Sequence, residues 1–156
     1  MFTLAPFDLE LPIDNVGGMP LHPLVVHAAV VLVPLAALGL IVMATSGARS
    51  KRYSPAVILV AVAGAVSAFL AMLSGEQLRD EIGMRNQQHF EWGEYLPWAA
   101  LGLMVIVLVL ALLDRQSGGK RNLFTTILAL VGVVVAVGTI VLTVLAGHSG
   151  AELVWG

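Results

Sequence analysis

The stretch Leu21-His22-Pro23-Leu24-Val25-Val26-His27 opens the first of four long apolar runs in the chain. Pro23 suits the first turn of a helix, where its missing N–H group is not needed. An α-helix needs about 20 apolar residues to cross the hydrocarbon layer of a membrane, and residues 24–44 supply that length. The stretch therefore predicts a transmembrane helix with His22 and His27 at its entrance.

Three more apolar runs follow, so we expect four transmembrane helices at about 24–44, 55–74, 96–113 and 123–146. The 156-residue chain is 58% hydrophobic and 12% charged, which is about half the charged share of an ordinary soluble domain. The fold class that we expect is an all-α membrane protein, with two helical hairpins forming a bundle over residues 21–156. A net charge of −2 and the absence of cysteine favour neither a nucleic-acid partner nor a thiolate metal site.

Residues 1–20 are expected to form an acidic arm outside the bundle. Prolines and the Gly17-Gly18 pair interrupt any helical period, and the arm lacks the basic residues with which a signal peptide begins. Its apolar side chains are more numerous than a solvated tail needs. Two interpretations stay open, namely a loose tail and an arm that docks on the membrane or on a partner.

The basic residues predict the orientation of the helices. Only Arg79 and Arg85 lie on one side of the expected membrane. The other six lie in the short loops after the first and third runs: Arg49, Lys51, Arg52, Arg115, Lys120 and Arg121. The positive-inside rule therefore places both short loops in the cytoplasm and both termini outside the cell membrane, here the plasma membrane of a bacterium.

Small residues recur at helical spacing on the second and fourth runs. These residues are Ala63, Ser67, Ala71 and Gly75 on the second run, and Gly132, Ala136, Thr139, Thr143 and Gly147 on the fourth. Small residues allow helix backbones to approach closely in a membrane. We expect the two stripes to form the internal seam of the bundle; the alternative is a surface for helices of another protein.

All four histidines, including His89 and His148, stand beside the ends of apolar runs and on the predicted outer side. His27 is the most informative, because an ionisable residue inside a span indicates a function and requires a polar partner. We expect this partner to be Glu76 or His148. We also expect His89 to fold over the cluster from an interfacial helix before the third span.

Three interpretations of the histidine cluster remain open. In the first, a neutral His27 has a structural role and is hydrogen-bonded to a carbonyl or a carboxylate. In the second, the cluster binds a metal such as Zn²⁺ or Cu²⁺; the candidate ligands are His22, His27, His89, His148, Glu76 and Glu94. In the third, His27 and His148 are the axial ligands of a b-type haem held between facing helices.

Four motifs resemble those of the bacterial membrane family catalogued as domain of unknown function 2231. They are the opening stretch quoted above, Ser74-Gly75-Glu76, His89 with Gly93-Glu94, and the closing Gly147-His148-Ser149-Gly150-Ala151-Glu152-Leu153-Val154-Trp155-Gly156. The resemblance covers about residues 20–156. The family pattern usually has an aromatic residue after the second histidine and a Gly-Gly pair in the closing motif, where this chain has Ala28 and Gly150-Ala151. The resemblance implies a four-helix fold with the histidines on one side, and it implies no activity.

The function that we expect is an accessory or interaction subunit of a larger membrane complex, and not an enzyme. Apart from His27, no run carries the charged residues expected of an ion pump or transporter. The expected partners are the lipid bilayer and membrane proteins that pack on the helices or the arm. Respiratory-chain complexes are the expected host by analogy, because they collect small helical subunits. The alternative is a haem b or transition-metal protein that uses the outer histidines for electron transfer or metal handling.

Overall fold

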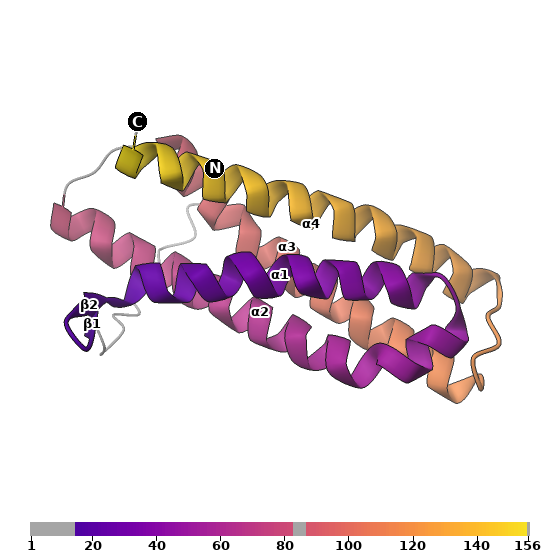
Figure 1. The fold of residues 1–156 in the computed structure, drawn as a ribbon. Coiled ribbons are helices and arrows are strands. Elements are labelled where there is room, and N and C mark those ends of the chain that lie inside the picture. The colour runs from indigo at the N-terminus through magenta and orange to yellow at the C-terminus, as the bar shows by residue number, and fades with distance from the viewer. Residues whose placement is uncertain (1–14, 83–86, 156) are drawn as a thin grey trace, which may run out of the picture.

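The structure is a computed structural model that describes residues 15–82 and 87–155 (Figure 1). The helices are α1 (Leu21–Ala44), α2 (Gly47–Ile82), α3 (Gln87–Gln116) and α4 (Leu123–Trp155). Each helix contains a stretch that is long and apolar enough to cross a membrane. The prediction of an all-helical membrane fold with four spans is therefore confirmed.

Helices that follow one another in the sequence also lie side by side in the bundle. α1 packs on α2, α2 on α3 and α3 on α4, and α4 returns to pack on α1 (Figure 1). α1 also contacts α3 across the centre. We call the end where residues 45–46 and 117–122 connect the helices the loop end, and the end where α1 begins and α4 finishes the termini end.

The core changes in character along the bundle. Toward the loop end, the buried side chains include large ones such as Leu40, Met43 and Leu110. Toward the termini end, most of the buried core residues that the structure describes are alanines. Larger buried side chains make more dispersion contacts each, and those that the structure describes lie mainly toward the loop end.

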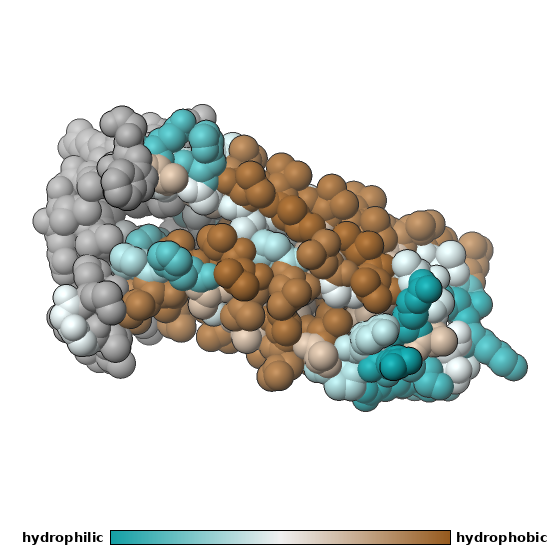
Figure 2. Space-filling view, viewed as in Figure 1, coloured by the Kyte–Doolittle hydropathy of each residue, from teal (hydrophilic) through white to brown (hydrophobic). Residues whose placement is uncertain are grey.

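Large apolar side chains point outward along all four helices. Leu59 and Val134 are 71% and 73% exposed, and Figure 2 shows a broad hydrophobic band along the bundle with hydrophilic residues toward both ends. A soluble protein rarely exposes an apolar surface of this extent. The band fits the hydrocarbon layer of a membrane, as the composition predicts.

Residues 15–20 correct one expectation, because the end of the predicted arm is not irregular. Asn15–Val16 (β1) and Met19–Pro20 (β2) pair as an antiparallel hairpin. Gly17 and Gly18 form its turn with φ angles of 62° and 83°, which glycine adopts without the strain that other residues meet. The Gly-Gly pair that breaks a helix thus makes a hairpin. Residues 1–14 of the arm lie outside the described residues.

The start of α2 corrects a second expectation. Arg49, Lys51 and Arg52 were expected in a loop, but they lie in the first turns of α2, which begins at Gly47. Ser46 accepts a hydrogen bond from the backbone N–H of Arg49 at 3.2 Å and so caps the helix. The apolar run marks the part of the helix inside the membrane, whereas the cap marks where the helix begins.

The small-residue seam of α2 lies beside the predicted one. Ala61, Ala65 and Ala68 are buried, whereas the predicted stripe from Ala63 to Gly75 is half-buried along its length. α1 and α2 lie close together at Gly64, where a Cβ atom would lie 3.2 Å from the backbone nitrogen of Val33. α2 therefore turns the neighbouring small residues toward α1.

The predicted stripe of α4 lies in the interior from Gly132 to Thr143, whereas its last member, Gly147, is half-buried. Ala136, Thr139 and Thr143 are all at most 2% exposed, and both threonines donate their hydroxyls to carbonyls one turn earlier in α4 at 2.8 Å. Gly132 faces α3 and α1, because a Cβ atom there would lie 3.1 Å from Ile106 and 3.5 Å from Leu40. This stripe is the seam on which α4 meets its neighbours.

Candidate functional site

His22 joins the start of α1 to α2. Its Nδ1 lies 2.9 Å from the carbonyl oxygen of Ala71 and 3.3 Å from the hydroxyl oxygen of Ser74. Because a carbonyl oxygen can only accept, Nδ1 carries the proton and donates to it. Gly75 leaves room for the ring, since a Cβ atom there would lie 2.9 Å from His22 Cε1. Residues of two separate motifs thus form one contact between helices.

His27 faces away from the core, contrary to the expectation that it meets Glu76 or His148. Its side chain is exposed, and its Nδ1 donates to the carbonyl oxygen of Pro23 in its own helix. The reason is the helical period: Ala29, which is buried, lies about 200° around the helix from His27. His22 lies seven residues before Ala29, close to two full turns, and so shares the buried face.

His148 also lies on an outer surface. Its Nε2 is 3.3 Å from Glu152 Oε1 one turn further along α4, and the two side chains are 71% and 61% exposed. Such a pair on a helix surface contributes little to stability. Among the described residues, His27 and His148 each bond within their own helix, so the arrangement expected for two axial haem ligands is not formed.

The described part of the chain contains no group of three His, Asp or Glu side chains placed to hold a metal ion. Glu94 is exposed on α3, and Glu76 is exposed near the end of the apolar part of α2. His89 lies in the first turn of α3, and its side chain is outside the described residues. Its place in a metal site stays a prediction.

The main polar centre is at the opposite end of the bundle, and sequence reasoning missed it. We call it the loop-end clamp: Asp114, Arg121 and the carbonyl groups of Met43 and Ala44. Arg121 donates from Nε to Asp114 Oδ1 at 3.1 Å and from Nη2 to Oδ2 at 2.9 Å. It also donates to the carbonyl of Met43 at 2.7 Å and to that of Ala44. Asp114 is fully buried, and the Arg121 side chain is 13% exposed.

The chemistry of the clamp explains its role. A guanidinium group presents several N–H donors in a plane, so it can bind both oxygens of one carboxylate and still donate elsewhere. The last carbonyls of a helix lack partners within the helix and carry a partial negative charge. Arg121 therefore links the end of α1 to the end of α3 through hydrogen bonds to both. Arg121 uses four of its five N–H donors within the clamp, which indicates a structural role.

The two short loops also meet directly. A Cβ atom on Gly47 would lie 2.8 Å from the carbonyl carbon of Gly119, so the two backbones touch. Gly118 and Gly119 turn the chain with φ angles of 66° and 88°, and Lys51 Nζ donates to the Gly118 carbonyl at 3.3 Å. Asn122 then caps α4 in a reciprocal pair with Thr125, two bonds of 2.9 Å each.

The family model described as predicted membrane protein, DUF2231, matches residues 18–156. The chain belongs to the DUF2231 family. This confirms the resemblance inferred from the motifs. No curated protein and no solved structure matches the chain.

The sequence motifs and the loop-end clamp of this DUF2231 protein consist of different residues and lie at opposite ends of the bundle. The motif residues His22, Ser74 and Gly75 meet at the termini end. Asp114 and Arg121 belong to none of the motifs, and their distance in sequence gave no sign of a buried pair. The signal that was available is Asn122 followed by Thr125, a cap that fixes where α4 begins and hence where Arg121 stands.

Proposed function

We propose that this DUF2231 protein is a non-enzymatic accessory subunit of a larger complex in the bacterial plasma membrane. The observation that carries the proposal is the length of the helices. α2 has 36 residues and α4 has 33, which correspond to about 54 and 50 Å at 1.5 Å per residue. The hydrocarbon layer is only about 30 Å thick, so both helices extend beyond it.

The extension falls mostly at the termini end. There α2 continues from its apolar part to Ile82, and α4 continues to Trp155, at the same end of the bundle as the β1–β2 hairpin (Figure 1). At the loop end, by contrast, α1, α3 and α4 each end or begin within three residues of their apolar runs, and only α2 starts earlier, at Gly47. A rigid projection of this kind offers a partner a surface outside the membrane.

The exposed residues where α3 enters the third span border this surface and have a composition that suits an interface. Tyr95 and Trp98 are 61% and 62% exposed, and Glu91 and Glu94 beside them are also exposed. Phe69 of α2 holds Trp98 in an edge-to-face contact with ring centroids 5.4 Å apart. Tyr and Trp are enriched in protein interfaces because their rings combine apolar area with a polar group.

We further propose that the loop end lies in the cytoplasm. The structure gathers Arg49, Lys51, Arg52 and Arg115 at this end with exposed side chains, which supports the positive-inside argument. Arg121 adds little, because its charge is paired with Asp114. Respiratory-chain complexes are the first class of host to examine, by analogy with the small helical subunits that they contain.

The test is native electrophoresis of the tagged protein, extracted from its own membranes in a mild detergent. We expect a band well above the 16.4 kDa of the chain. The double variant Tyr95→Ala, Trp98→Ala should release the free protein, whereas Leu123→Ala, Phe124→Ala, which changes two exposed apolar residues at the loop end, should not. A wild-type protein that runs alone would end the proposal, and a Soret band in its visible spectrum would favour the haem alternative instead.

A further inference from the structure

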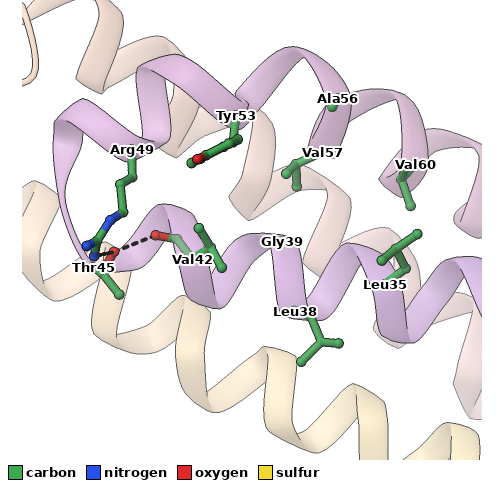
Figure 3. Close-up of a pocket in the computed structure, with 10 residues that line it drawn as sticks. All are labelled: Leu35, Leu38, Gly39, Val42, Thr45, Arg49, Tyr53, Ala56, Val57 and Val60. Atoms are coloured by element: carbon green, nitrogen blue, oxygen red, sulfur yellow. Dashed lines mark hydrogen bonds between the residues drawn. The ribbon is translucent and has the colours of Figure 1, made fainter.

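A groove of about 680 Å³ lies between α1 and α2 on the outward surface of the bundle, near the loop end (Figure 3). Most of its lining is apolar. Gly39 and Val57 form its floor, where a Cβ atom on Gly39 would lie 2.7 Å from Val57 Cγ2. Ala56 is exposed on its wall. The groove therefore exists because small residues stand where larger ones would close it.

One end of the groove is polar. Arg49, Thr45 and Tyr53 line it there (Figure 3). Arg49 Nη1 donates to Thr45 Oγ1 at 2.8 Å, and this hydroxyl donates in turn to the Val42 carbonyl at 2.6 Å. These bonds hold the exposed guanidinium at the mouth of the groove. A guanidinium has five N–H donors, so most of those of Arg49 remain available to an anion.

The length of the groove matches one leaflet of a membrane. Arg49 and Val60 are eleven residues apart on α2, which corresponds to about 16 Å. Half of the hydrocarbon layer is about 15 Å. When Arg49 lies at the membrane surface, Val60 therefore lies near the middle of the bilayer, and the groove between them follows the direction of an acyl chain.

We propose that this groove binds one anionic phospholipid, with an acyl chain between α1 and α2 and the phosphate group at Arg49. The cation at the mouth, with Arg52 close to the ring of Tyr53 at 5.6 Å from its centroid, complements a headgroup of negative charge. Basic pockets between transmembrane helices recognise such lipids. A helix about 10 Å across would occupy roughly 1,250 Å³ over the same length, about twice the volume of the groove.

The experiment is native mass spectrometry of the purified, delipidated protein with a phosphatidylglycerol or a phosphatidylcholine of identical acyl chains. We expect one phosphatidylglycerol per chain, retained at least about fivefold more than phosphatidylcholine. Arg49→Gln should remove this preference, and Ala56→Trp, which fills the groove from its exposed wall, should lower binding of both lipids. The matched controls are Arg115→Gln and Leu112→Trp, which change an exposed arginine and an exposed apolar residue on α3; both should behave as wild type.

Three results would overturn the proposal. Equal retention of the two lipids by the wild type would mean that Arg49 does not select the headgroup. An equal loss of phosphatidylglycerol in Arg49→Gln and Arg115→Gln would show attraction to surface charge in general. A dimer mass that disappears in Ala56→Trp would show that a second copy of the chain occupies the groove. The thermal unfolding temperature of Ala56→Trp verifies that this variant is folded, and Arg49→Gln tests the headgroup independently of it.

Discussion

The two ends of the bundle differ in how their polar residues bond. At the loop end, the buried Asp114 and the largely buried Arg121 bond to each other and to the end of α1. At the termini end, His22 bonds to Ala71 of α2, but His27 and His148 are exposed and bond within their own helices. A polar group stabilises a bundle when its bond joins two helices away from water, because the alternative is an unpaired buried group. Among the described residues, the loop end therefore has the more extensive polar contact between helices.

The largest effect is expected from Arg121→Met, which leaves Asp114 buried without its partner. Breaking one side of a buried ion pair costs about 3–5 kcal/mol, and the carbonyls of Met43 and Ala44 lose a donor as well. The free energy of unfolding in detergent measures the change. Arg115→Met is the control, because Arg115 is exposed on the last turn of α3. Similar costs for the two variants would contradict a clamp at this end.

A smaller effect is expected where the two loops touch. Gly47→Val places side-chain atoms against the backbone of Gly119, and overpacking of this kind costs about 1–3 kcal/mol. Gly138→Val on α4 is the matched control, since no atom lies within 4 Å of a Cβ atom at that position. Unfolding in detergent should therefore separate the two variants. Equal stability would mean that the loops are not in contact in the folded protein.

At the termini end, the two histidines of the opening motif are expected to contribute differently to stability. His22→Leu removes the hydrogen bond to Ala71, and we expect a loss of about 1 kcal/mol in the free energy of unfolding. His27→Leu should have a smaller effect, because His27 is exposed and bonds only to Pro23 among the described residues. A greater cost for His27→Leu would show that His27 has a partner on another helix, as the sequence first suggested.

The smallest effect is expected from His148→Ala. The pair of His148 with Glu152 is largely exposed, so its loss should change the free energy of unfolding by less than about 0.5 kcal/mol. The free energy of unfolding in detergent again measures this change. A loss of 2 kcal/mol or more would place His148 in a buried site and would revive the cofactor interpretation.

The sequence was sufficient to predict the number of membrane-spanning helices and the small-residue seam of α4. Apolar runs reveal membrane spans because the bilayer selects for hydrophobicity over a fixed length. The predicted stripe of α4, which consists of Gly132, Ala136, Thr139 and Thr143 over this length, lies near one buried face of the helix. On α2, small residues occupy adjacent positions, Ala63 with Gly64 and Ser67 with Ala68, so spacing alone could not decide which face is buried. Hydropathy also placed the start of α2 too late, because Ser46 caps it outside the apolar run.

The histidines and the clamp illustrate a difference between local and tertiary information. The opposite faces of His22 and His27 could have been derived from the helical period, once Ala29 is placed in the core. The clamp could not be derived in this way. Arg121 reaches Asp114 only because the chain reverses at Gly118 and Gly119, and its bonds to α1 depend on the packing of helices distant in the sequence.

The backbone contact between Gly47 and Gly119 has a consequence for how this family can diverge. The connections at residues 45–46 and 117–122 rest on each other, so an inserted residue in one displaces the surface that the other occupies. A change of length in either connection therefore requires a compensating change in its counterpart. We expect insertions and deletions among DUF2231 relatives to accumulate instead where α2 passes into α3 and at the chain ends, which would make the loop end the most reliable landmark for aligning distant members.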